Sequence, residues 1–177
     1  MIEELKYPVG QYKKPAAFTK EILSNAISVI ENFPKKIKQE TENLSDEQLD
    51  TPYRPEGWTV RQVVHHCADS HMNAFIRLKL ALSEDTPTIK PYTEALWAEM
   101  DDCKNFPIRS SFQIIEGVHT RWTVLLKGLT DMDLNRGFIH PEKGRELSLY
   151  ESTDMYAWHC NHHLAHITNL KKRKGWI

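Results

Sequence analysis

Four of the nine histidines of this chain lie within eight consecutive positions near its C-terminal end. If this stretch is helical, residues four apart share a face, so the cluster forms two pairs, His159 with His163 and His162 with His166. Two imidazoles one turn apart can bind the same metal ion, as in other helical histidine pairs. The same spacing also arises by chance in a histidine-rich chain, where packed or surface histidines are the alternative. A catalytic metal site further requires a third ligand and an open coordination position.

The cluster lies in a segment, 148–174, whose pattern predicts a long helix. The residues expected to face the protein interior recur at helical spacing around His163: Tyr156, His159, Cys160, His163, Ile167 and Leu170. His162 and His166 lie nearer the edge of this stripe. The segment ends in four consecutive cations followed by Gly175, a pattern typical of a helix C-terminus, and we interpret it so rather than as a nucleic-acid patch.

The rest of the chain predicts three further long helices that would surround this segment. They cover 15–33, broken or kinked at Pro34 and continued over 35–43, then 59–83 and 110–127. The shorter elements expected are an extended stretch over 1–14, a capped turn at 45–49, a short helix over 93–104 and a hairpin over 136–149. Without repeats or linkers, this pattern predicts one all-α domain, 1–177, a four-helix bundle with a small β-hairpin before the last helix.

Composition excludes several classes of function. Lysine and arginine (23) nearly balance aspartate and glutamate (24), so the net charge of −1 argues against a nucleic-acid partner. The sequence contains no apolar run long enough to cross a bilayer and no signal-peptide pattern, so no membrane partner is expected. Three scattered cysteines without C-x-x-C spacing suit a reduced, cytoplasmic protein rather than a disulfide framework.

The segment 59–83 carries a second set of histidines beside its apolar stripe. His66, Ser70, Asn73 and Arg77 form a polar line along one flank, which predicts either a pocket wall or a solvated flank. His71 falls inside the apolar stripe and is interpreted as a core histidine, while His65 points to the far side of the helix. In the segment 110–127, His119 faces the core.

Several of these stretches together resemble the DinB-like four-helix-bundle proteins, and specifically their YfiT subgroup. The resemblance rests on Tyr7-Pro8, the run from Tyr53 through Trp58 to His65-His66 and on to Asn73, His140-Pro141-Glu142, and Trp158-His159 through His162-His163. It implies that one divalent metal ion per chain is held by His66, His159 and His163. It also implies a homodimer. Zinc is the expected metal, with nickel as the second candidate, because nitrogen ligands suit both ions.

The resemblance implies two chemistries for such a site. One is hydrolysis of a small-molecule substrate by a metal-bound water, and the other is transfer of a low-molecular-weight thiol, in some relatives bacillithiol, as a metal-bound thiolate. No general base is evident, because Cys160 and Asn161 follow His159 where a H-E-x-x-H motif would place glutamate. Asn73 and Arg77, like Glu142 in the hairpin, could contact substrate or be structural.

A non-catalytic alternative also stays open: the chain could be a binding protein for a metal ion or a small molecule. A structural metal site usually has four protein ligands and no open position. A fourth ligand from His119, His162 or His166 would favour that alternative. His119 is also the residue most able to replace one of the three expected ligands, and His162 and His166 could instead lie beside the pocket.

Overall fold

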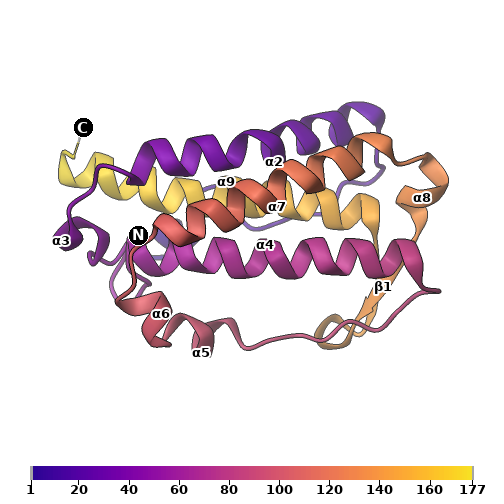
Figure 1. The fold of residues 1–177 in the computed structure, drawn as a ribbon. Helices are drawn as coiled ribbons and strands as arrows, with labels where there is room; N and C mark the ends of the chain where they lie inside the picture. The colour runs from indigo at the N-terminus through magenta and orange to yellow at the C-terminus, as the bar shows by residue number, and fades with distance from the viewer. Residues whose placement is uncertain (1, 177) are drawn as a thin grey trace.

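Four long helices packed side by side form the body of the computed structural model, which describes residues 2–176 (Figure 1). They are α2 (Lys20–Thr41), α4 (Val60–Ser83), α7 (Arg109–Gly128) and α9 (Leu149–Lys174). Helix α9 lies against α2 and α4, and α7 lies against the same two helices from the other side. The expected all-α four-helix bundle with a small hairpin before the last helix is confirmed.

The order of the helices around the bundle follows from a long crossover. In Figure 1, α4 and α7 run in the same direction, because the chain between them returns along the outside of the bundle. That return carries two short helices, α5 (Glu94–Ala98) and α6 (Asp101–Lys104). Helix α9 runs opposite to α4, so the middle of α9 faces the first half of α4 across the bundle. This arrangement brings the two histidine clusters together.

Local capping determines where the two helices of the histidine clusters begin. The Thr59 side chain accepts a hydrogen bond from the backbone N–H of Gln62, whose side chain bonds back to Thr59, so a capping box starts α4. Ser148 caps α9 in a similar way, through the N–H of Glu151. Gly175 ends α9 in the left-handed conformation, with φ of 68°. The expected bounds of both helices are confirmed.

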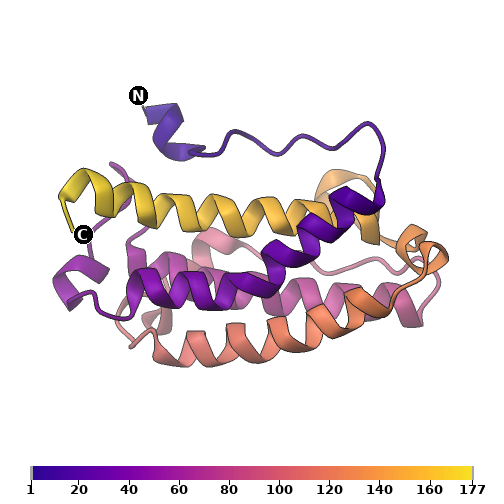
Figure 2. The same cartoon turned by 90° about the horizontal axis from the view of Figure 1, so that it is seen from above.

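Three expectations for the secondary structure were wrong in part. The chain forms a one-turn helix, α1 (Ile2–Lys6), within the stretch expected to be extended, and it rests on α9. The expected helix over 93–104 is divided, because the Gln62 side chain donates a hydrogen bond to the Ala98 carbonyl (2.8 Å) that would otherwise accept within the helix. Helix α2 begins later than expected, at Lys20. It continues through Pro34 and is bent in Figure 2, which agrees with the expected kink rather than with a break.

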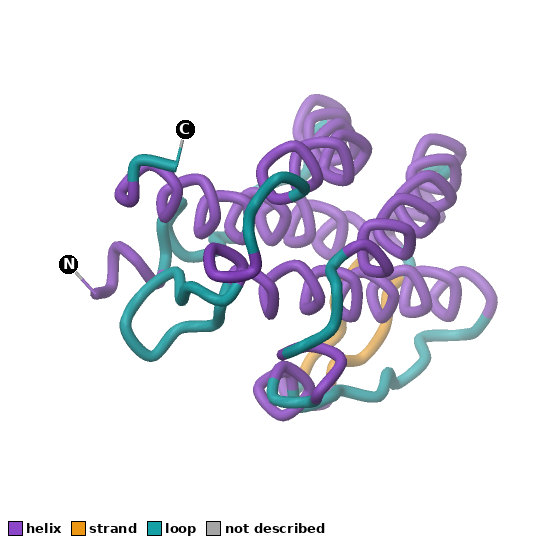
Figure 3. Tube along the Cα trace, turned by 60° about the vertical axis from the view of Figure 1, so that its left-hand side comes forward, coloured by secondary structure: helices purple, strands orange, loops and turns teal. Residues whose placement is uncertain are grey.

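The smaller elements close the ends of the bundle. Helices α3 (Asp46–Leu49) and α8 (Asp131–Asn135) are single turns, and only α3 was expected. Strands β1 (Gly137–His140) and β2 (Arg145–Ser148) pair antiparallel around a 3₁₀ turn, Pro141–Lys143, and Gly144 with φ of 60° completes the turn. Figure 3 shows the hairpin outside the four helices, beside the crossover.

The N-terminal segment runs along the outer side of α9 (Figure 2). Among the contacts that hold it there, the indole N–H of Trp158 donates to the Gly10 carbonyl (3.0 Å), the Tyr12 hydroxyl donates to Asp154 (2.9 Å), and His166 Nε2 lies 3.1 Å from the Lys6 carbonyl. Lys14 also forms an ion pair with Glu151 (2.9 Å). Helix α9 is therefore covered on two sides, by the bundle and by this segment. Within residues 2–176, none of the helices is long and apolar enough to cross a membrane.

Candidate metal centre

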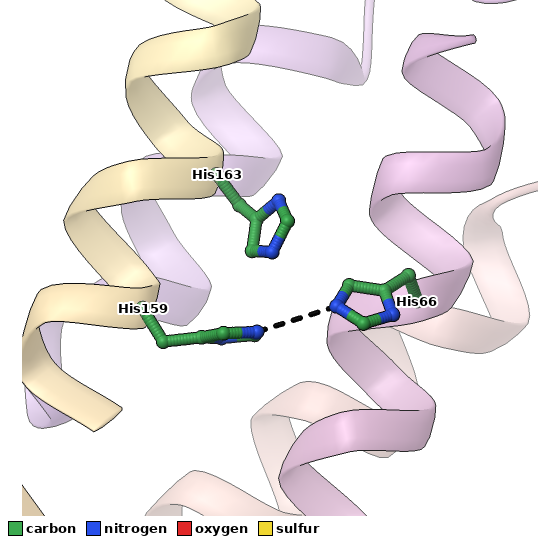
Figure 4. Close-up of side chains that lie close together, drawn as sticks. All are labelled: His66, His159 and His163. Carbon is green, nitrogen blue, oxygen red and sulfur yellow. Dashed lines mark hydrogen bonds between the residues drawn. The ribbon is translucent and has the colours of Figure 1, made fainter. Parts of the chain in front are cut away.

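Three histidines from two antiparallel helices converge where α9 crosses α4. His66 comes from α4, and His159 and His163 come from successive turns of α9. One ring nitrogen of each lies within 4.8 Å of the others, and Figure 4 shows the three rings turned toward a common point. The structure thus brings together the three residues expected as ligands.

The closest pair in this group has the separation that a shared ion requires. The Nε2 atoms of His66 and His159 lie 3.2 Å apart, as the dashed line in Figure 4 marks. Two nitrogens bound about 2.0–2.1 Å from one tetrahedral ion lie about 3.3 Å from each other. His66 and His163 are buried, and their rings meet edge to face at 4.7 Å between centroids. The residues present therefore fit a small divalent ion.

Burial keeps the three imidazoles neutral. It lowers the pKa of His66 to about 4, with a further contribution from neighbouring His162. Burial likewise holds the pKa of His159 and His163 well below the ordinary histidine value, and the other histidines around them add to the effect. A neutral imidazole offers a lone pair to a metal, whereas an imidazolium does not. The site is therefore ready to bind a cation at neutral pH.

Trp58 forms one wall of the centre, a role that the residue pattern alone did not assign. Its ring lies 4.7 Å from that of His66 and is stacked 6.5 Å from that of His163. Trp58 directly precedes the Thr59 cap of α4, so the start of this helix fixes its position. It is half-buried, and it shields one side of the histidines from solvent.

The polar line on α4 is largely covered. Ser70 and Arg77 are buried like His66, and Asn73 is half-buried, which excludes a solvated flank. Asn73 donates a hydrogen bond to the Asp69 carbonyl on its own helix, and Arg77 donates one to the Lys90 carbonyl (3.3 Å) in the crossover. Neither of these two hydrogen bonds involves the converging histidines, and substrate contact by Asn73 or Arg77 stays a prediction.

His119 and His71 form a second group with Cys160, separate from the three converging rings. His119 Nε2 lies 2.7 Å from His71 Nδ1, and His119 Nδ1 lies 2.6 Å from the Ile30 carbonyl, so both His119 nitrogens face partners in the core. Burial raises the pKa of the Cys160 thiol well above its ordinary value, which disfavours a thiolate ligand. His119 does not take the place of an expected ligand.

His162 and His166 form a third group with His163, on the side of α9 that the N-terminal segment covers. His166 stacks on Tyr53 with 3.8 Å between ring centroids, and His162 stacks on Trp158. All three residues of this group belong to one helix. Their ring nitrogens lie within 4.8 Å of one another, as in the first group. The group that combines α4 with α9 is distinguished by the 3.2 Å separation of the His66 and His159 Nε2 atoms, which suits one shared ion.

The other histidine and cysteine predictions agree with the contacts observed. His65 lies on the far side of α4, between the Ser111 hydroxyl (2.7 Å) and the Phe106 carbonyl (3.0 Å). His71 and Cys160 are fully buried. Glu142 is exposed on the hairpin turn.

Comparison with known proteins places this architecture in a family. The model of the DinB superfamily matches residues 30–167, which include all three converging histidines. The chain belongs to the DinB superfamily. Within it, a Bacillus subtilis protein named "Putative metal-dependent hydrolase YfiT" is 49% identical over 172 residues, 97% of each chain. A relative from Oceanobacillus iheyensis with the same description is 52% identical over 171 residues, 97% of this chain and 98% of the relative.

A solved DinB-superfamily structure agrees closely with this one. YfiT from Bacillus subtilis, described as "a probable metal-dependent hydrolase with an unusual four-helix bundle topology", superposes with a TM-score of 0.95 at 49% identity. The match covers 98% of this chain and 99% of the other. The expected membership of the YfiT subgroup is thereby confirmed.

Proposed function

We propose that this chain is an enzyme that binds one divalent metal ion through His66, His159 and His163 and hydrolyses a small-molecule substrate there. The observation that carries the proposal is the convergence of three neutral ring nitrogens within 4.8 Å, two of them 3.2 Å apart. The relatives named above carry the description "Putative metal-dependent hydrolase", which supports the same function. Zinc is the first candidate and nickel the second, because both accept imidazole ligands.

The donor set supports catalysis rather than a purely structural role. Three neutral imidazoles leave the charge of the ion uncompensated, and a divalent ion with an open position lowers the pKa of a bound water toward neutrality. A structural site would have a fourth protein ligand. Among residues 2–176, His119 belongs to a separate group, and His162 and His166 group with His163 but not with His66 or His159, which supports a site with three protein ligands.

None of the three cysteines is suited to act as the nucleophile. Burial raises the pKa of Cys67 and Cys160 far above the ordinary thiol value, and it raises that of Cys103 to about 12, with Asp69 adding to the effect. All three cysteines therefore stay protonated at neutral pH and are poor nucleophiles. In the proposed function, the residues of the chain bind the metal ion and orient the substrate. The attacking atom belongs to water or to a second substrate.

A second candidate function is thiol S-transfer, with a low-molecular-weight thiol such as bacillithiol as the co-substrate. One observation favours it: within the described residues, no carboxylate joins any of the three groups of potential metal ligands. Hydrolysis benefits from a general base beside the attacking water. A thiol held as its thiolate needs no such base, because the positive charge of a metal favours deprotonation.

One experiment separates these functions. Purified chain loaded with zinc or nickel would be mixed with ester and amide probes, and separately with a panel of thiols and an alkylating electrophile. If the chain is a hydrolase, a probe should turn over without added thiol. If it is an S-transferase, the loss of thiol should be faster with the protein than without it. His163→Ala should abolish either activity, while His162→Ala should retain it. Tight metal binding without turnover in either assay would instead indicate a binding protein. The homodimer stays a prediction that light scattering would test.

A further inference from the structure

The side of His159 that faces away from the metal centre begins a chain of hydrogen bonds across the whole bundle. His159 Nδ1 lies 3.1 Å from His71 Nε2, His71 Nδ1 lies 2.7 Å from His119 Nε2, and His119 Nδ1 lies 2.6 Å from the Ile30 carbonyl oxygen. These residues belong to α9, α4, α7 and α2 in that order. Each of the four long helices thus contributes one member.

The carbonyl at the end of this chain determines the direction of every bond in it. A carbonyl oxygen only accepts, so His119 Nδ1 carries the hydrogen and, in a neutral ring, His119 Nε2 is an acceptor. His71 Nδ1 must then donate to His119, which leaves His71 Nε2 as an acceptor. His159 Nδ1 must in turn donate to His71. In the neutral His159 ring, the remaining lone pair is on Nε2, the atom that lies 3.2 Å from His66 Nε2.

Pro34 explains why the Ile30 carbonyl is free to accept from His119. In an α-helix, the carbonyl of residue 30 accepts a hydrogen bond from the N–H of residue 34, and proline has no N–H. Helix α2 continues through Pro34, so this carbonyl lies in the core without its usual partner. The His119 ring supplies the missing donor, which accounts for both the proline inside the helix and the histidine inside the core.

The side chains around His71 and His119 restrict the orientation of the two rings. His71 and His119 are 0% and 1% exposed. The Phe33 ring packs against both of them, at 5.1 Å and 5.5 Å between centroids, and Trp122 also contacts both. His71 Nε2 also lies 4.0 Å from the Cys160 sulfur, and a protonated thiol is a weak donor, so this contact agrees with an acceptor at His71 Nε2. A change of tautomer along the three rings would set two acceptors or two donors against each other.

From this geometry we infer that His71 and His119 are positioning residues that hold His159 in the Nδ1–H tautomer, with the Nε2 lone pair directed at the metal. A metal-binding histidine that donates its other N–H to a fixed acceptor is better oriented and more basic. The inference depends on the metal site of the proposed function but not on which reaction occurs there. The inference gives a function to His71 and His119, a pair of core histidines that a site with three ligands does not itself require.

The first test uses wild-type, metal-free protein labelled with ¹⁵N at histidine. Ring ¹⁵N chemical shifts distinguish the two tautomers of each histidine, and we expect His159, His71 and His119 all as Nδ1–H forms. A predominant Nε2–H form at His159 would overturn the inference. This measurement needs no variant and no activity, so a failure of the proposed reaction would not affect it.

The second test measures metal affinity by competition with a chelator. His71→Phe keeps a ring in place but removes the acceptor for His159, and we expect affinity to fall about 10–100-fold, the usual effect of losing such an outer partner. His71→Gln can present its side-chain oxygen to His159 Nδ1, so it should retain more affinity than His71→Phe and keep the Nδ1–H form of His159. Equal affinities in wild type and His71→Phe, or in the two variants, would count against the inference.

Trp122→Phe is the matched control for packing. Trp122 borders the same two histidines and is 2% exposed, yet it is not a member of the chain of bonds. We expect this variant to lose stability in a thermal melt while keeping wild-type metal affinity and tautomers. If Trp122→Phe weakened metal binding as much as His71→Phe, core packing rather than tautomer selection would explain both, and the inference would be wrong.

Discussion

Helix α9 carries two histidine pairs of identical spacing on two of its sides, and the pairs have different partners. His159 and His163 face α4, where His66 completes a group of three ring nitrogens. His162 and His166 face the N-terminal segment, where His166 lies against the Lys6 carbonyl and Tyr7 packs against His162 at 5.9 Å between centroids. The inner pair meets another imidazole, and the outer pair meets backbone and aromatic rings.

This difference shows that i, i+4 spacing of histidines on one helix does not by itself identify a metal site. A third ligand on the facing helix distinguishes the two pairs. Both pairs satisfy the i, i+4 rule equally well. Within residues 2–176, only the inner pair forms a group with an imidazole of another long helix. In that pair, His159 Nδ1 also lies 3.1 Å from Nε2 of the buried His71. The outer pair fastens the N-terminal segment to α9. If metal binding belongs to the inner pair and attachment of the N-terminal segment to the outer pair, substitutions on the two sides of α9 should have different effects.

Loss of an inner histidine should have the largest effect. In His163→Ala, one of three ligands is missing, so metal affinity should fall by more than the roughly 10–100-fold that is usual for an outer partner. In His162→Ala, the three converging nitrogens are intact and affinity should stay within about twofold of wild type. Metal per chain, measured after dialysis, checks both. If His162→Ala lost metal as His163→Ala does, the group of His162, His163 and His166 would be the true site.

Low pH should destabilise the metal-free protein, because His119 is buried in its neutral form in the core of the bundle. Burial lowers the pKa of His119 from 6.5 to about 4, so the folded state binds fewer protons than the unfolded state between these values. The stability that this group contributes is present above pH 6.5 and is lost as the pH falls toward 4. The loss between pH 7 and pH 5 should be about 2 kcal/mol for this residue.

Urea unfolding at pH 7 and pH 5 measures this effect. In His119→Phe, the part of the pH dependence that belongs to His119 disappears, so the difference between the two pH values should shrink by about 2 kcal/mol. An unchanged difference would mean that His119 is not buried in its neutral form. Metal must be removed first, since an ion bound only to the folded state adds its own pH dependence.

Features that depend on neighbours in the sequence were predictable. Thr59 and Ser148 cap their helices through backbone groups three residues away, and Gly175 ends the last helix, so the bounds of α4 and α9 follow from local pattern. The face of α9 that points inward follows in the same way. His66 was different: its place beside the apolar stripe gave only a weak reason to choose it, and the family resemblance supplied the choice.

Features that depend on distant partners were not predictable. At the break between α5 and α6, the Ala98 carbonyl accepts a hydrogen bond from Gln62, which is 36 residues earlier in the chain. The continuation of α2 through Pro34 is matched by His119, on another helix. The one-turn helix α1 ends at Lys6, whose carbonyl lies against His166, 160 residues later. In each case a tertiary contact outweighs the local preference of the chain, and one sequence does not record which residues will meet.

Loss of the His166 contact should lower stability without affecting metal binding. His166→Phe keeps a ring to stack on Tyr53, but it leaves the Lys6 carbonyl without its partner. The free energy of unfolding should fall by about 1 kcal/mol, the usual net value of one hydrogen bond. Urea unfolding of the metal-free protein measures the loss, and metal per chain should equal that of wild type. A fall in metal content would show that the outer pair also serves the site.

The smallest effect is expected at Trp158, where the N-terminal segment meets the exposed edge of α9. Trp158→Phe removes the donor to the Gly10 carbonyl, a contact open to water, so unfolding should become easier by only about 0.5 kcal/mol. The change should be local, because the segment can detach while the four long helices stay packed. Limited proteolysis should therefore cut within residues 7–19 faster than in wild type, at an unchanged rate elsewhere. Tyr12→Phe, which removes the neighbouring bond to Asp154, should behave alike. Equal cleavage in all three proteins would mean that these two bonds do not hold the segment, and that its other contacts with α9, such as the ion pair of Lys14 with Glu151, hold it instead.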